Sequence, residues 1–129
     1  MVILLAIQFV LGIYINLYVV FPPLNTVMHA HAFPSNYIAV MFHMLIGFLM
    51  LIVSFIMLLL GARIRNGILI ASSSIAFVFV LVAGISGIMF LFNEYSIYSF
   101  LMSISFMIVV VAEFSYMYQL SVLNHKGAI

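Results

Sequence analysis

Residues 37–60, YIAVMFHMLIGFLMLIVSFIMLLL, contain no charged side chain and decide the fold class. At a rise of about 1.5 Å per residue, a helix of this length crosses the roughly 30 Å hydrocarbon layer of a membrane. Three further runs, near 1–21, 68–92 and 97–120, are similarly apolar. The four runs predict an all-α, polytopic membrane protein with one membrane domain, 1–129, built as a bundle of four transmembrane helices.

The composition supports this class, because 69% of the 129 residues are hydrophobic and only 4% are charged. A soluble domain carries about a quarter charged residues, so the lipid bilayer must surround most of these side chains. Three basic residues are too few to form a nucleic-acid site. The absence of cysteine excludes disulfides, cysteine-ligated iron–sulfur clusters and thiolate metal sites.

The basic residues predict the orientation of the bundle. With four crossings, the N-terminus, the loop with Arg63 and Arg65 and the tail with Lys126 share one side. The positive-inside rule makes that side cytoplasmic, so we expect both the N and C termini in the cytoplasm. The first run lacks a basic segment and a cleavage pattern before Pro22, so we expect it to be retained in a multi-pass protein of the cell membrane.

Polar residues within the spans define two predicted layers, since such residues are costly unless they face the bundle interior. The outer layer takes one polar residue from each helix: Asn16, His43, Ser86 and Ser103. The inner layer comprises Gln8, Ser54, Ser72, Ser73, Ser74 and Glu113. At about 100° per residue, each of the first three helices presents one stripe of small or polar residues, which is how membrane helices pack.

His43 is the sharpest candidate for a binding residue. A histidine in the outer third of a membrane bundle can ligate a haem iron axially or donate a hydrogen bond to a quinone carbonyl. Gly84 and Gly87 on the third helix would leave room for a flat ring, but they equally permit close helix packing. The alternative is a neutral histidine that bonds Asn16 or a backbone carbonyl and joins two helices. The third and fourth helices contain no second histidine to complete a haem site.

Two other places carry weaker candidates. His29 and His31 have a spacing suited to copper or zinc on an extended segment, but without a third ligand in the sequence a solvated loop is the favoured interpretation. Glu113 is the only carboxylate within a predicted span. It either relays protons or is a structural residue held by Gln8, Tyr116 or a partner subunit.

The stretch QFVLG at 8–12 is followed by FPP at 21–23 and then by His43 on the next helix. This order resembles one half of the haem A synthase family, in which a Q-x-x-L-G helix leads through a proline-bearing outer loop to a helix with a haem-ligating histidine. The resemblance covers residues 5–60 and implies a haem-binding four-helix unit with His43 as the ligand. The family's glutamate-x-x-histidine-arginine helix has no counterpart here, so haem or quinone binding, and not haem A synthesis, is what it implies.

Together these features predict a redox-associated membrane protein that binds haem b or a quinone near His43. We expect it to act as a small subunit of a respiratory-chain type of electron-transport complex. The alternative is a ligand-free structural accessory subunit that packs against larger membrane subunits or self-associates. Because little of the chain lies outside the predicted spans, we do not expect an autonomous enzyme.

Overall fold

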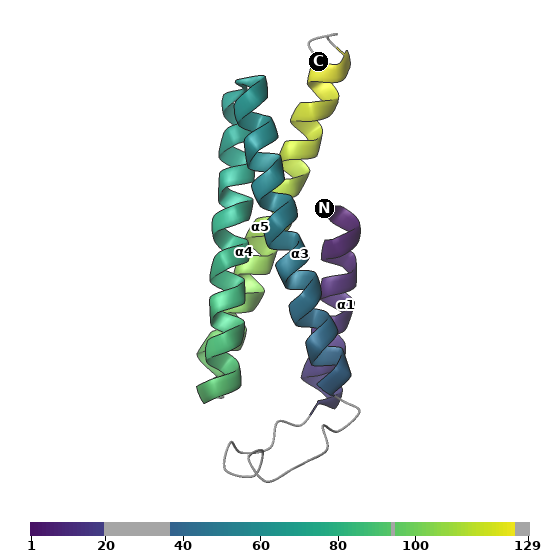
Figure 1. Cartoon of the computed structure of the whole chain (residues 1–129), viewed down its shortest axis with the longest axis vertical. Coiled ribbons are helices and arrows are strands. Elements are labelled where there is room, and N and C mark those ends of the chain that lie inside the picture. Colours follow the sequence, from purple (N-terminus) through teal and green to yellow (C-terminus); the bar gives the residue numbers. More distant parts are fainter. Residues whose placement is uncertain (20–36, 94, 126–129) are drawn as a thin grey trace.

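The structure is a computed structural model that describes residues 1–19, 37–93 and 95–125. Within these ranges, four helices run along one axis in an elongated bundle (Figure 1). Their bounds are α1 Val2–Tyr18, α3 Tyr37–Ile64, α4 Gly67–Asn93 and α5 Ser96–His125. The all-α prediction is confirmed. Helices α3, α4 and α5 are long and apolar enough to cross a membrane, whereas α1, with 17 residues, is a shorter apolar helix.

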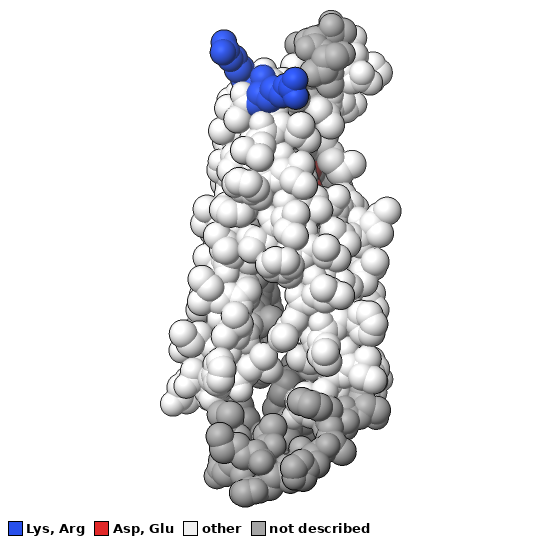
Figure 2. Space-filling model, viewed as in Figure 1, with Lys and Arg blue, Asp and Glu red and all other residues white. Residues whose placement is uncertain are grey.

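Large apolar side chains cover the outside of the bundle, while small polar side chains lie inside it. Phe48 and Phe92 are more than half exposed, whereas Ser54, Ser73 and Glu113 are buried. Figure 2 shows basic side chains gathered at one end of an otherwise almost uncharged face. A bundle with its apolar residues outward has lipid as its solvent, so the chain is a helical membrane protein.

Arg63, in the last turn of α3, and Arg65, in the turn between α3 and α4, lie at that end of the bundle. Arg65 adopts the left-handed conformation, with a φ of 57°, and its amide donates to the carbonyl of Ala62 at 3.2 Å. The side-chain oxygen of Asn66 then accepts hydrogen bonds from the amides of Ile68 and Leu69 at 3.0 and 3.1 Å. These bonds cap α4 and explain why the chain reverses so abruptly.

The second helix ends later than the sequence predicts, and Gly61 lies within it. The sequence predicts an end near residue 60, but α3 continues to Ile64. A Cβ on Gly61 would lie 3.2 Å from the backbone carbonyl carbon of Leu69, so this glycine permits close approach of α3 and α4 and does not end a helix. Elsewhere the bounds shift by a few residues, with α1 ending at Tyr18 and α5 continuing to His125.

The tight part of the bundle consists of α3, α4 and α5, and small side chains line its interior. Ser54 is fully buried, and its hydroxyl donates to the carbonyl of Leu51 on the same helix at 2.9 Å. Ser73 is 1% exposed, and its hydroxyl donates to the carbonyl of Leu69. Such bonds satisfy the hydroxyls within one helix and let neighbouring backbones approach.

Helix α1 packs mainly on α3 and touches α5 little, which leaves an open seam between α1 and α5. It also begins beside the middle of the bundle and not at its end (Figure 1). Met1 lines the same cleft as Met57 of α3 and Glu113 of α5, so α1 starts about two turns short of Ile64. The assignment of Gln8 to the inner layer assumes that Met1 lies at the inner surface of the membrane. Because α1 starts nearer the middle of the bundle, this assumption is wrong for Gln8.

Candidate functional site

A polar contact joins α1 to α3 near the middle of α1. Nε2 of Gln8 lies 3.1 Å from Nε2 of His43. Two glycines make room for this pair: a Cβ on Gly12 would lie 3.5 Å from the His43 ring, and one on Gly47 would lie 3.5 Å from the Gln8 amide nitrogen. The pair therefore fills the space that the missing side chains leave between the two helices.

The atoms of this contact determine the tautomer of His43. An amide nitrogen can only donate, so Nε2 of His43 must accept the hydrogen bond from Gln8 and carries no proton. The ring is then a neutral imidazole with its proton on Nδ1. That Nδ1 and Oε1 of Gln8 are both buried and have no hydrogen-bond partner among the described residues. The pair thus offers one unused donor and one unused acceptor inside the bundle.

The residues predicted to surround His43 are only partly brought to it. Gln8, assigned to the inner layer, is its partner, and Asn16 is exposed. Eight residues beyond Gln8, α1 has rotated by about 80°, which turns Asn16 away from α3. A Cβ on Gly87 would contact only α5, and one on Gly84 would meet nothing within 4 Å. A Cβ on either glycine would therefore lie more than 4 Å from His43, and a role for these glycines beside a flat ring stays a prediction.

The burial of the remaining polar residues differs between the two predicted layers. The inner layer lies in the core, with these buried members: Ser54, Ser72, Ser73 and Glu113. In the outer layer, Ser86 is buried, but Ser103 is exposed and its hydroxyl donates to the carbonyl of Ser99 on its own helix. The inner layer is therefore the real centre of packing, and the outer layer is reduced to two of its four members.

Glu113 is the buried carboxyl of the bundle, only 2% exposed. Its Oε1 has no hydrogen-bond partner among the described residues. The prediction that Gln8 holds this carboxyl is wrong, because Gln8 contacts His43 on the α3 side of α1. Tyr116, one turn further along α5, lines the same cleft as Glu113.

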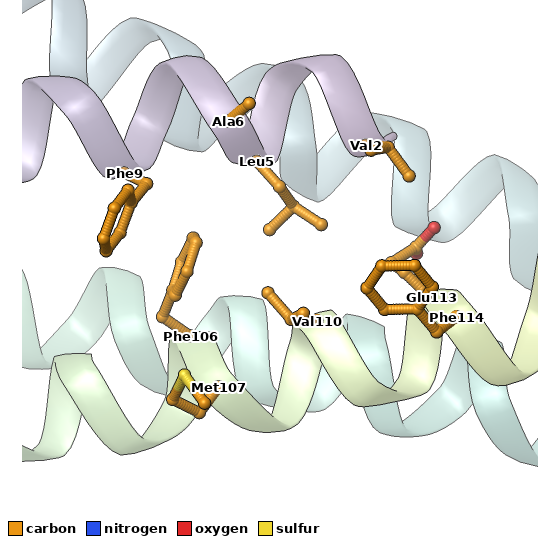
Figure 3. A pocket seen from close by; sticks show the side chains of 9 residues that line it. All are labelled: Val2, Leu5, Ala6, Phe9, Phe106, Met107, Val110, Glu113 and Phe114. Carbon is orange, nitrogen blue, oxygen red and sulfur yellow. The ribbon is translucent and has the colours of Figure 1, made fainter.

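Two apolar clefts lie along the seam between α1 and α5 and meet at Val2 and Glu113. The first has a volume of about 340 Å³, and its lining includes Leu5, Phe9, Phe106, Val110, Glu113 and Phe114. Figure 3 shows Phe9 and Phe106 facing each other at one end and Glu113 beside Phe114 at the other. The second cleft, of about 370 Å³, continues past Glu113 to Met57 and Tyr116.

The aromatic cleft was not predicted from the sequence, although one signal points to it. Phe106, Val110 and Glu113 are spaced at i, i+4 and i+7, which places them on one face of a helix. A carboxyl on the same face as an aromatic ring within a membrane span is uncommon. What the sequence does not contain is the identity of the facing helix, which turns out to be α1.

The predicted metal ligands His29 and His31 lie outside the described residues. Within the described ranges, no group of three or more histidine, aspartate or glutamate side chains could hold a metal ion. Comparison with models of protein families, with curated proteins and with solved structures finds no match. The class is therefore defined by fold and composition: a helical membrane protein with a polar pair on one edge of α1 and a carboxyl-bearing cleft on the other.

Proposed function

We propose that this protein is a redox-associated membrane subunit in which the Gln8–His43 pair binds the head group of a quinone. The carrying observation is the unused hydrogen-bonding capacity of the pair at Nδ1 of His43 and Oε1 of Gln8. A protonated Nδ1 suits a quinone carbonyl, and Oε1 suits a quinol hydroxyl, so one site serves both redox states of the ring. A buried polar atom left unpaired costs about 1–3 kcal/mol, which a ligand with matching groups would offset.

Haem b is supported less well by the same geometry. Nε2 of His43 has the lone pair that a haem iron would need, and this lone pair accepts the hydrogen bond from Gln8. His125, the other histidine in the described ranges, lies at the opposite end of the bundle from the start of α3 (Figure 1). Among the described residues His43 has no second histidine beside it to complete an axially ligated haem site, and the resemblance to haem A synthases stays a prediction.

The proposal includes a topology with four crossings of the cell membrane and both termini in the cytoplasm. The 17 residues of α1 are at the short end of what spans a bilayer. The arginines at the α3–α4 turn define the cytoplasmic side. His43 follows the first residue of α3 by less than two turns, which puts the pair in the outer half of the membrane.

The test is the quinone content of protein purified from its native membrane in mild detergent. We expect quinone in a stoichiometric amount with the wild-type chain and its loss in His43→Phe, which keeps a ring but removes both nitrogens. Asn16→Leu is the matched control, because it removes an exposed polar side chain from α1. Equal quinone in wild type and His43→Phe would contradict the proposal, as would a Soret absorption band that His43→Phe abolishes.

A ligand-free accessory subunit is the second candidate, and the direct contact between Gln8 and His43 favours it. A hydrogen bond between two helices stabilises a membrane bundle without any ligand. The open seam between α1 and α5 also leaves apolar surface for a larger subunit. This candidate predicts co-purifying membrane proteins and no quinone, so the same purification distinguishes the two functions.

A further inference from the structure

The seam between α1 and α5 contains a second polar centre that the proposed quinone site does not use. Glu113 is only 2% exposed, and its Oε1 has no hydrogen-bond partner among the described residues. The side chain lines both clefts. A carboxyl within a membrane bundle is expected to face a partner or a pathway, and the Glu113 side chain lies where the two clefts of the seam meet.

Three phenylalanine rings contribute to the lining of the first cleft, whose other walls are aliphatic. The rings of Phe9 and Phe106 are 5.8 Å apart with an interplanar angle of 21°, and Phe114 lies beside Glu113 (Figure 3). The face of an aromatic ring attracts a cation, and the attraction grows when water is excluded. The ring of Phe114 next to the Glu113 carboxyl therefore favours a ligand with a positive charge and an apolar body over a neutral or anionic one.

The cleft can be reached from the lipid and has the size of a small ligand. Phe9 and Phe114 are 53% and 64% exposed on the outside of the bundle, and α1 and α5 touch little along the seam. The volume of about 340 Å³ lies at the small end of the range for ligand pockets. A single-ring organic cation that partitions into the membrane matches both the size and the route of entry.

We propose that the seam between α1 and α5 binds a lipophilic organic cation, an apolar body with one quaternary or protonated amine, whose charge pairs with Glu113. Met1 lines the second cleft with Glu113, so its amine is a group with which such a cation would compete. The site is lined on α1 by Val2, Leu5, Ala6 and Phe9, and neither Gln8 nor His43 belongs to its lining. It therefore stands or fails independently of quinone binding.

The test compares two probes of the same shape that differ in charge. One is para-butylphenyltrimethylammonium, and the other is para-butyl-tert-butylbenzene, in which carbon replaces the nitrogen. Saturable binding of each labelled probe is measured by equilibrium dialysis with the full chain in zwitterionic lipid nanodiscs, which avoids attraction to anionic headgroups. We expect the cation to bind more tightly than the neutral probe by at least about tenfold. Equal binding, or no saturable binding of the cation, would overturn the proposal.

Two variants separate the charge from the space. Glu113→Gln keeps the side-chain shape and should remove the preference for the cation. Ala6→Trp fills the first cleft, keeps the carboxyl and should abolish saturable binding of both probes. Ser115→Ala, at an exposed position of α5, is the control and should bind as wild type does. Circular dichroism and gel filtration establish that each variant is folded.

The outcomes of these variants are decisive even if one of them fails to fold. A preference for the cation that persists in folded Glu113→Gln contradicts the role of the carboxyl. Undiminished binding to folded Ala6→Trp contradicts the location. Acetylation of Met1 removes the competing amine charge and should leave the preference for the cation in place; its loss would count against the site.

Discussion

Helices α4 and α1 are both apolar, yet they meet their neighbours very differently. Helix α4 buries a row of small residues that includes Ser73 and Ala76, so its backbone lies close to α3 and α5. Helix α1 buries only Leu5 and approaches α3 closely only where glycines flank Gln8 and His43. Tight packing in this protein therefore follows small side chains, and both candidate sites lie on the edges of the loosely packed helix.

The largest expected effect distinguishes a leucine of α4 from one of α1. Leu69 has no exposed surface, whereas Leu17 is 66% exposed. We expect Leu69→Ala to lower the free energy of unfolding by about 2 kcal/mol or more, because the cavity loses packing contacts. Leu17→Ala should change it by no more than about 0.5 kcal/mol. Unfolding in mixed detergent micelles measures both, and equal losses would contradict the difference between the two helices.

Two glycines give a second, intermediate contrast. A Cβ on Gly61 would meet the backbone of Leu69 at 3.2 Å, and backbone atoms cannot move aside easily, whereas one on Gly84 would meet nothing within 4 Å. Gly61→Ala should therefore destabilise the bundle by about 1–3 kcal/mol. Gly84→Ala should be neutral or stabilise it by up to about 1 kcal/mol. A Gly61→Ala protein as stable as wild type would show that α3 and α4 are not packed as described.

The smallest expected effect is at the contact between α1 and α3. Hydrogen bonds between membrane helices contribute about 0.6 kcal/mol on average, and the coupling between Gln8 and His43 should be of that size. A double-mutant cycle with Gln8→Leu and His43→Phe measures this coupling in the same micelle assay. The pair Asn16→Leu and His43→Phe is the control and should show none. No coupling between Gln8 and His43 would remove the basis of the proposed quinone site.

The class and most helix positions were predictable because they depend on local sequence. Long apolar runs without charges predict membrane helices, and the predicted loop with Arg63 and Arg65 corresponds to the turn between α3 and α4. Gly61 misled the prediction of the second helix end, because a glycine in a membrane helix has two uses. It can end the helix or admit a neighbouring backbone, and only the position of Leu69 shows which applies.

The candidate sites depend on how the helices are placed against one another, and the sequence of a single helix does not determine this placement. The sequence predicts that Gln8 and Glu113 share the inner layer, because this prediction measures the depth of Gln8 in the membrane from Met1. The offset of α1 along the bundle moves Gln8 to His43 and leaves Glu113 facing the seam with α5. A one-helix periodicity fixes the face of a residue but not the height of its helix, so the partners could not be predicted.

The most direct test of the proposed quinone site is the nuclear magnetic resonance spectrum of the His43 ring nitrogens. Protein labelled with nitrogen-15 at histidine is recorded in micelles, and His43→Phe identifies the signals that belong to His43. The geometry predicts a neutral ring with the proton on Nδ1, and a short-chain quinone should shift the Nδ1 signal. A proton on Nε2, or no response of His43 to the quinone, would contradict the central claim.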